Sequence, residues 1–216
     1  MPIKAILFDI DGVLVDSNDL HVNAWEAAFA RRGLQADRAS IRAQIGKGGD
    51  NLVPALFPDV SEEAVEALSD VHGEVFKAKY LDQVRPFPRT RDLVLRVHEA
   101  GLRIALASSA SQGELDHYLD LLDIRAVVDA TTTIDDVKAS KPAGDIVSAV
   151  VRKLGVEPAE ALLIGDTPYD IESAARSGVA TIAVLSGGFP REALKGARAV
   201  YDDAAALAAR FPEWID

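Results

Sequence analysis

Residues 8–17 read FDIDGVLVDS and follow the apolar run 3–8, which predicts a buried strand ending at two acids. Asp9 and Asp11 are two positions apart, so an extended backbone turns both side chains to one face. Gly12 then lets the chain turn because it has no Cβ. Two such carboxylates repel each other unless a cation or a proton relieves them. Mg²⁺ suits this arrangement, although an isolated Asp-x-Asp is more often a strand that ends in a polar turn.

The composition of the 216-residue chain is that of a globular protein with one sizeable domain, or one domain with a smaller insertion. Apolar residues make up 49% and charged residues 26%. The net charge of −11 disfavours nucleic acid or an anionic membrane as a partner. The absence of cysteine excludes disulfides, thiol nucleophiles and cysteine metal sites. The first apolar run is short and no window has transmembrane length, so we expect a cytoplasmic protein, a monomer or weak homodimer.

Residues 17–81 show helical patterns and no strand candidate. Apolar spacing predicts helices over 17–32, after 37, and from the N-cap Ser61 to about 80. Between them lie a glycine-rich loop, residues 45–50, and an apolar turn, residues 52–57, interrupted by Pro54. This part of the chain is predicted to form a small helical domain.

The remaining chain alternates between helix and strand patterns. The expected helices cover 91–100, 114–122, 145–154 and 171–177, and the expected strands cover 102–107, 126–130, 161–164 and 181–185. Three of these helices end on a glycine just before a strand, the usual C-cap of such units: Gly101, Gly155 and Gly178. The strands are almost continuously apolar, as in a parallel sheet that helices cover on both faces. The predicted fold is α/β, a doubly wound parallel sheet formed by residues 1–16 and 82–216, with residues 17–81 inserted as a helical cap domain.

Polar residues collect where the predicted strands end. Ligands of such sheets bind beyond the carboxyl ends of the strands. The side chains expected there are Asp9, Asp11, Ser108, Ser109, Ser140, Lys141, Asp166 and Asp170. Singly, Ser108 is typical of a strand terminator, Lys141 of a solvated loop, and Asp170 of a helix-start cap. Together they indicate a site for a metal ion and a phosphoryl group.

The chemistry offers a role for each residue type at this edge. A carboxylate can attack phosphorus and form an aspartyl-phosphate. Phosphoryl transfer needs positioning and neutralisation of the equatorial oxygens, which a metal, a lysine and hydroxyl or backbone donors supply. A second carboxyl group can protonate the leaving oxygen and then deprotonate the attacking water.

These motifs resemble the haloacid dehalogenase-like (HAD) superfamily of phosphohydrolases, in the branch of phosphoglycolate phosphatases and β-phosphoglucomutases that carries a small helical cap. The resemblance covers nearly the whole chain: FDIDGVLVDS is highly specific, and SKP at 140–142 and GDTPYD at 165–170 follow in the expected order. It implies a Mg²⁺-dependent phosphatase that acts on a small phosphorylated metabolite through an aspartyl-phosphate.

The resemblance also implies roles for individual residues. Asp9 would be the nucleophile, and Asp11 the general acid/base whose backbone carbonyl meets the metal. Ser108 and Lys141 would hold the phosphoryl group, helped by the backbone around Ile10, Gly12 and Ser109. Asp166 would be a direct Mg²⁺ ligand, and Asp170 a metal-site acid acting directly, through a water or through a hydrogen bond.

Three residues of the helical segment are candidates for substrate contact or core packing. His21 lies one turn beyond Ser17 and is either near the acid/base or solvent-facing. Trp25 is expected in the core of the cap. Lys47, flanked by glycines, either contacts an anion from the cap or lies in a mobile surface turn.

The alternatives to a phosphatase differ in specific residues. Sugar phosphomutases of this superfamily resemble the chain at His21 and Trp25, but typically have a Glu-Asp pair at 165–166 and an arginine near 48, where this chain has Gly-Asp and Gly48. Hydrolysis is therefore favoured, with the mutase as the alternative. Asp11 argues against dehalogenase activity. Schiff-base phosphonatase chemistry at Lys47 is a remote option, and so is a non-catalytic phosphoacceptor.

Overall fold

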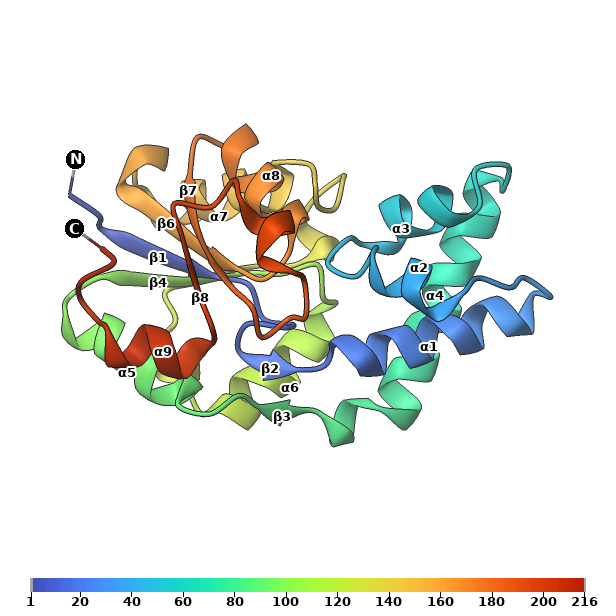
Figure 1. Ribbon diagram of the computed structural model, residues 1–216, viewed down its shortest axis with the longest axis horizontal. Helices are drawn as coiled ribbons and strands as arrows, with labels where there is room; N and C mark the ends of the chain where they lie inside the picture. Colours follow the sequence, from blue (N-terminus) through green and yellow to red (C-terminus); the bar gives the residue numbers. More distant parts are fainter. Residues whose placement is uncertain (1, 216) are drawn as a thin grey trace.

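The computed structural model describes residues 2–215 and contains a six-stranded sheet beside a separate group of helices (Figure 1). The strand order is β5-β4-β1-β6-β7-β8, and every pairing between neighbours is parallel. The strands are β1 Ala5–Phe8, β4 Arg103–Ala107, β5 Ala130–Thr132, β6 Ala161–Gly165, β7 Ala180–Val184 and β8 Ala199–Tyr201. The predicted doubly wound α/β sheet is confirmed, and it places the ends of β1, β4 and β6 at one edge.

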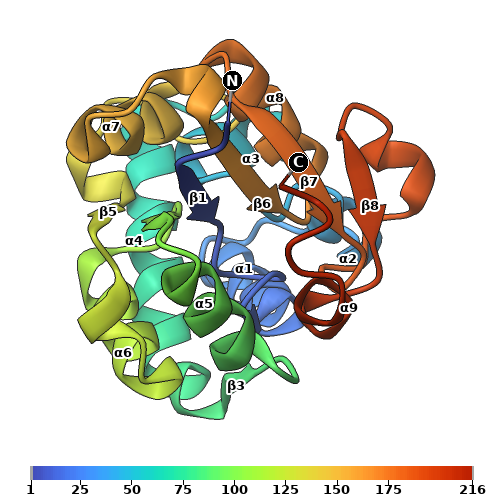
Figure 2. The same cartoon turned by 90° about the vertical axis from the view of Figure 1, so that its left-hand side faces the viewer.

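Helices cover both faces of the sheet (Figure 2). They are α5 Thr90–Glu99, α6 Gln112–Leu122, α7 Asp145–Leu154, α8 Pro168–Arg176 and α9 Ala204–Ala209. The alternation of β1 side chains divides the core, since Ile6 and Phe8 pack with α5, α6 and α9, while Ala5 and Leu7 pack with α7 and α8. Both sets are fully buried. Residues in the centre of this sheet therefore have no solvent-facing side, as their continuous apolar character predicted.

The helical segment lies between β2 (Val15–Asp16) and β3 (Arg85–Pro86), which pair antiparallel with each other. Its helices are α1 Asn18–Arg31, α2 Arg38–Arg42, α3 Gly49–Leu56 and α4 Glu62–Lys79. They enclose a hydrophobic cluster of their own, to which Trp25, Phe29 and Leu68 belong. The expected packing of Trp25 is confirmed, because its side chain is almost completely buried in this cluster.

Local signals located several element ends correctly. The Ser61 hydroxyl accepts a hydrogen bond from the Ala64 backbone N–H at 3.3 Å and caps α4. Gly101, Gly155 and Gly178 all adopt positive φ after their helices, a backbone region that other residues rarely enter.

Other elements differ from the sequence prediction. Residues 49–56 form helix α3 with Pro54 inside it, where a glycine loop and an apolar turn were expected. The strand expected at 126–130 is wrong in position, because 125–127 form a 3₁₀ turn and β5 begins at Ala130. The sequence reading also missed β8, α9 and the β2–β3 ribbon. Within residues 2–215, no helix combines the length and the apolar character needed to cross a membrane.

Candidate active site

Asp9 and Asp11 lie where β1 leaves the sheet. The Asp9 backbone N–H donates to the Ile164 carbonyl of β6 at 2.9 Å, so the last ladder contact fixes Asp9 at the sheet edge. Asp9 is 4% exposed, which makes it a buried acid at the base of a cavity. Burial, together with the nearby Asp170 charge, raises the pKa of Asp9 to about 7 despite the opposing effect of Lys141. Its carboxylate therefore depends on cations for its charge.

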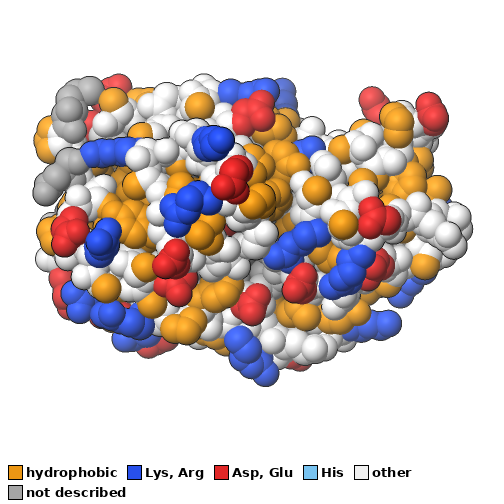
Figure 3. All heavy atoms as spheres, viewed as in Figure 1, with side chains coloured by type: hydrophobic (Ala, Val, Ile, Leu, Met, Phe, Trp, Pro, Cys, Tyr) orange, Lys and Arg blue, Asp and Glu red, His pale blue; other side chains and the backbone are white. Residues whose placement is uncertain are grey.

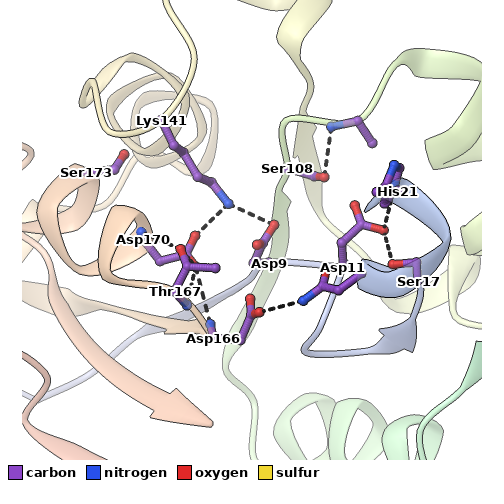
Figure 4. A network of polar contacts seen from close by, with 12 residues as sticks. Asp9, Asp11, Ser17, His21, Ser108, Lys141, Asp166, Thr167, Asp170 and Ser173 are labelled. Atoms are coloured by element: carbon purple, nitrogen blue, oxygen red, sulfur yellow. Dashed lines mark hydrogen bonds and ion pairs between the residues drawn. The ribbon is translucent and has the colours of Figure 1, made fainter. Parts of the chain in front are cut away.

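Lys141 supplies one of those cations. Its Nζ lies 2.8 Å from Asp9 Oδ1 and 2.6 Å from Asp170 Oδ1, so the ammonium bridges two acids from different strand ends (Figure 4). The side chain is 1% exposed. Although burial opposes the charge, Asp170 and Asp9 raise the pKa of Lys141, and it remains an ammonium.

Asp170 has two distinct contacts. Its Oδ2 accepts hydrogen bonds from Thr167 Oγ1 at 2.7 Å and from the Thr167 and Asp166 backbone N–H groups, which caps α8. Its Oδ1 faces Lys141. Asp170 therefore caps the start of α8 with Oδ2 and contacts Lys141 with Oδ1, so both roles suggested by the sequence are present.

Asp9, Asp166 and Asp170 form an acidic cluster in which one oxygen of each lies within 4.8 Å of the others. Burial and the charges of Asp170 and Asp9 raise the pKa of Asp166 well above its usual range. Asp166 Oδ1 is buried and has no hydrogen-bond partner among the described residues. The Asp9 carboxylate and the unpartnered Asp166 oxygen are hard donors that fit a Mg²⁺ ion, whose charge would relieve the repulsion that Lys141 leaves.

Glycines bring the backbone close to Asp166. A Cβ at Gly12, where φ is +77°, would lie 2.2 Å from Asp166 Oδ2, and a Cβ at Gly187 would lie 1.7 Å from the same atom. Neither position accepts a side chain without moving the acid. Asn18 closes the remaining side, since its Nδ2 donates to Asp166 Oδ2 at 3.0 Å and to the Gly187 carbonyl at 3.1 Å.

Asp11 points away from this cluster and has its own partners. Ser17 Oγ donates a short hydrogen bond to Asp11 Oδ1, and His21 Nε2 and Tyr118 Oη lie 3.3 Å from the same oxygen. Burial alone would raise the pKa of Asp11, but the His21 charge and the His21 and Ser17 hydrogen bonds hold it below the usual value. Burial likewise opposes the His21 charge, but Asp11 raises the pKa of His21.

A second histidine stands behind His21. His72 Nε2 of α4 lies 3.3 Å from His21 Nδ1, and the His72 ring stacks on Trp25 with a centroid distance of 4.2 Å. Burial and the adjacent His21 lower the pKa of His72 well below its usual value. A neutral His72 can accept a hydrogen bond from the Nδ1–H of a charged His21. The Nε2–H of His21 then donates to Asp11.

Ser108 and Ser109 follow β4 at the same edge. The Ser108 hydroxyl is buried and accepts a hydrogen bond from the Ala110 backbone N–H at 3.0 Å. The Ser109 Oγ is buried and has no hydrogen-bond partner within residues 2–215. Both residues line the cavity that holds Asp9 and Asp11, with backbone N–H groups nearby.

Lys47 lines the same cavity, but its amine is engaged elsewhere. Its Nζ lies 2.6 Å from Gln44 Oε1 and 4.5 Å from the centroid of the Tyr169 ring. The side chain therefore packs toward α8 rather than toward Lys141 and Asp9. Partial burial lowers the pKa of Lys47 while Glu172 opposes the shift.

The cavity has a volume of about 1090 Å³ and lies between the strand ends and the α1–α4 segment. Polar contacts at Ser140 join the two parts beside the cavity. Ser140, next to Lys141, accepts from the Gly48 N–H at 2.9 Å and donates its own N–H to Asp50 Oδ2 at 3.0 Å. The upper outline of the molecule is indented between the sheet-containing part and the helical segment (Figure 3).

The structure brings Asp9, Lys141, Asp166 and Asp170 into one cluster, and Asp11 and His21 into a second one beside it. Residues that contact these acids or His21, but that the sequence did not predict for the site, include Asn18, His72 and Tyr118. Asn18 immediately follows the 8–17 motif, which was the available signal. His72 and Tyr118 carried no signal, because helices distant in sequence bring them to the site.

The carboxyl edge of this parallel sheet carries an acid pair, a bridging lysine and two further acids. This arrangement is typical of enzymes that transfer a phosphoryl group. Residues 6–184 match the family model of haloacid dehalogenase-like hydrolases, and the chain belongs to that family. The protein is thus an enzyme of this hydrolase family, as the sequence motifs predicted.

Curated relatives span most of the chain. A phosphoglycolate phosphatase from Rhodospirillum rubrum is 28% identical, over 94% of this chain and 89% of its own length. The fructose-1-phosphate phosphatase YqaB from Escherichia coli is 27% identical, over 83% of this chain and 95% of its own. The pyrophosphatase PpaX from Oceanobacillus iheyensis is 28% identical, over 85% and 84%.

Solved structures agree with the fold. A hydrolase from Pseudomonas syringae superposes with a TM-score of 0.91 at 28% identity, over 97% of this chain and 98% of the other. CbbY from Rhodobacter sphaeroides, in complex with phosphate, gives a TM-score of 0.79 at 25% identity, over 95% and 96%.

Proposed function

We propose that this enzyme is a Mg²⁺-dependent phosphatase that hydrolyses a small phosphate monoester through a phosphorylated Asp9. The observation that carries the proposal is the Lys141 ammonium, buried between Asp9 Oδ1 and Asp170 Oδ1 at 2.8 and 2.6 Å. It holds Asp9 as a carboxylate at the base of a substrate-sized cavity. The relatives named as phosphatases for phosphoglycolate, fructose 1-phosphate and pyrophosphate support the reaction type.

The proposed first half-reaction uses Asp9 and Asp11. An Asp9 carboxylate oxygen attacks phosphorus, the P–O bond to the leaving group breaks, and the leaving oxygen takes a proton delivered through Asp11. His21 can supply this proton to Asp11, because the Asp11 charge raises the pKa of His21 against the effect of burial. Ser108, Ser109 and Lys141 hold the phosphoryl oxygens during the transfer.

The second half-reaction returns the enzyme to its starting state. Asp11, whose pKa is held low by His21 and Ser17 against the effect of burial, takes a proton from water. The resulting hydroxide attacks phosphorus and breaks the acyl phosphate, which releases inorganic phosphate and Asp9. The backbone around Gly12 and Ser109 completes the phosphoryl cradle in this proposal.

Asp9, Asp166 and the Asp11 carbonyl would hold Mg²⁺, which when bound would neutralise charge on the transferring group. Asp170 keeps both carboxylate oxygens in protein contacts, so its proposed contribution to the metal site passes through Lys141 and the α8 cap. We further propose that residues 17–81 act as a cap that closes over 1–16 and 82–216, in a cytoplasmic enzyme.

The test is Mg²⁺-dependent phosphate release from a panel of phosphate esters, with Asp9→Asn as the blank. The panel holds phosphoglycolate, hexose, pentose and glycerol phosphates, nucleoside monophosphates and the small generic substrate acetyl phosphate. We expect release that EDTA abolishes and that falls at least about a thousandfold in the variant. Asp9→Asn turnover above about a tenth of wild type would remove Asp9 from the nucleophile role.

The contact between His21 and Asp11 keeps a sugar phosphomutase as the alternative, since mutases of this superfamily resemble the chain at His21. The two reactions share the first half-reaction and differ in whether phospho-Asp9 passes its group to water or to sugar. Isomerised sugar phosphate without release of inorganic phosphate, in the same incubations, would establish the mutase.

A further inference from the structure

The charges that line the cavity are distributed unevenly. Apart from Asp9 and Asp11, seven acidic side chains line it, but apart from Lys141 only three lysines do. No arginine is among the lining residues of the described chain. A second phosphate or a carboxylate on the substrate is usually held by arginine, whose planar guanidinium fits these groups. The cavity has no side chain of this kind.

Helix α4 carries most of the excess acid. Glu62, Glu66, Asp70 and Glu74 are spaced by four residues, so they share one helical face, and all four line the cavity. Glu62 is favourable in the first turn of α4, and Glu74 lies 3.7 Å from Arg31. Like charges at this spacing destabilise a helix, so the stability of α4 does not account for Glu66 and Asp70. Glu66 and Asp70 are exposed and have no partner within residues 2–215. Their charges face the space that the leaving group would occupy.

The lysines of the cavity offer little compensation. The Lys47 amine is engaged by Gln44 and by the Tyr169 ring. Lys138 is an exposed lining residue, three positions after the acidic lining residue Asp135. Lys77 is exposed at the end of the acidic row. An anionic leaving group would therefore meet more repulsion than attraction.

The rest of the wall suits a hydroxyl-rich group. The half-buried His72 ring, which stacks on the almost completely buried Trp25, adds an aromatic group to the cavity lining. The exposed acidic row offers hydrogen-bond acceptors to hydroxyl or ammonium groups.

We infer that the substrate, within the phosphatase function proposed above, is a monophosphate whose leaving group is a neutral polyol or sugar, or one bearing an amine. Esters with a second phosphate or a carboxylate in the leaving group are disfavoured. The inferred substrate differs from pyrophosphate and phosphoglycolate, the compounds for which two of the relatives are named.

The test uses a matched series on one scaffold: glucosamine 6-phosphate, glucose 6-phosphate and 6-phosphogluconate, with fructose 1-phosphate against fructose 1,6-bisphosphate. The expected kcat/KM is at least about tenfold lower for the anionic member of each set, a difference of about 1.4 kcal/mol. Equal or higher kcat/KM for 6-phosphogluconate, the bisphosphate or phosphoglycolate would overturn the inference.

A charge-reversed pair of variants assigns the effect to the acidic row. Glu66→Lys should raise the ratio of kcat/KM for 6-phosphogluconate to that for glucose 6-phosphate by about threefold, and high salt should reduce the difference. Glu63→Lys is the control, because Glu63 is exposed on the same helix and does not line the cavity. An unchanged ratio in Glu66→Lys, or an equal change in Glu63→Lys, would contradict the role of the row.

Acetyl phosphate separates this inference from the proposed function. Its leaving group is too small to reach α4. If acetyl phosphate is hydrolysed through Asp9 but the anionic sugar phosphates are not the poorer substrates, the substrate inference is rejected and the phosphatase function stands. Absence of phosphate release from every compound rejects both.

A different set of contacts assigns Asn18 a positioning role at the metal site. Asn18 is 3% exposed at the start of α1, and its amide donates to both Asp166 Oδ2 and the Gly187 carbonyl. Asp166 Oδ1 has no hydrogen-bond partner within residues 2–215, and one oxygen of Asp166 lies within 4.8 Å of oxygens of Asp9 and Asp170. Because α1 belongs to the helical segment, the same amide links that segment to the acid that would bind the ion.

The test is calorimetric titration of the whole protein with MgCl₂ alone. Asn18→Ala and Asn18→Ser should weaken Mg²⁺ binding by about 10–100-fold, whereas Asn23→Ala on the same helix should not. A residue that only supports the fold would lower Tm and leave the Mg²⁺ affinity unchanged. That result, in either folded Asn18 variant, would overturn the assignment.

Discussion

The two walls of the cavity are built in opposite ways. On the sheet side, Asp9 and Lys141 line the cavity, while Asp166 and Asp170 lie beside them outside the lining. All four are 0–4% exposed and pair with one another or with backbone groups. On the α4 side, Glu66, Asp70 and Lys77 are exposed. Substitution of a buried charged residue leaves its partner charge buried and unpaired, which costs desolvation free energy. Substitution of an exposed charged residue has no such cost, because water solvates its neighbours. In this protein, substitutions on the α4 side should therefore be tolerated better than substitutions among the buried charges of the sheet side.

The strongest way to break this contrast is Lys141→Met. The variant removes the buried cation and leaves Asp9 facing Asp170, so unfolding free energy should fall by about 3–5 kcal/mol and kcat by about 10²–10³-fold. Urea unfolding followed by circular dichroism measures the first quantity. Lys79→Met, on the exposed side of α4, should change stability by less than about 0.5 kcal/mol. Equal effects of the two variants would refute the contrast.

A second test compares a glycine packed against the acidic cluster with a glycine of α4. Gly187→Ala places a Cβ 1.7 Å from Asp166 Oδ2, so we expect the acid to move and kcat to fall about 10²-fold. Gly73→Ala in the middle of α4 meets no atom within 4 Å and should stabilise the fold by about 0.5–1 kcal/mol. Steady-state kinetics and thermal unfolding report the two effects, and a fully active Gly187→Ala would contradict the close approach.

Lys47→Ala is expected to have a smaller effect. Lys47 lines the cavity, but its Nζ must leave Gln44 and the Tyr169 ring to contact a substrate. If the substrate draws the amine away from these partners, Lys47→Ala should raise KM by about three- to tenfold and change kcat less. Lys79→Ala serves as the exposed control. Unchanged kinetics on the preferred substrate would return Lys47 to a purely surface role.

His21 of α1 and His72 of α4 should differ in charge in the wild-type protein. Burial and His21 lower the pKa of His72, while Asp11 raises that of His21 against the effect of burial. At pH 6 we therefore expect a neutral His72 beside a protonated His21. Long-range ¹H–¹⁵N spectra across pH 5–8 distinguish the two rings, and protonation of His72 above pH 6.5 would contradict this order.

Much of the sheet side was readable from local sequence. The period-2 spacing of Asp9 and Asp11 after an apolar strand predicted two acids at one edge, and the glycine after each helix predicted where strands begin. Ser108, Lys141 and Asp166 each follow or flank a strand, so the parallel topology alone brings them together. Local periodicity and chain order were sufficient because regular elements carry these residues.

Other elements depended on contacts that no local pattern records. Residues 49–56 form a helix despite Pro54, because Gly48 and Asp50 bond to Ser140 from a distant loop. β5 begins at Ala130 because it pairs with β4 in a register that its short apolar run did not specify.

The sequence by itself determined the α/β fold class, the family and the acids at the sheet edge, since these follow from periodicity and motif order. Only the tertiary structure decided that Asn18 holds Asp166, that His72 stands behind His21, and that an acidic face of α4 lines the cavity. The physical reason is that these contacts join positions separated by 51 or 148 residues, and only the packed chain brings them within hydrogen-bond distance.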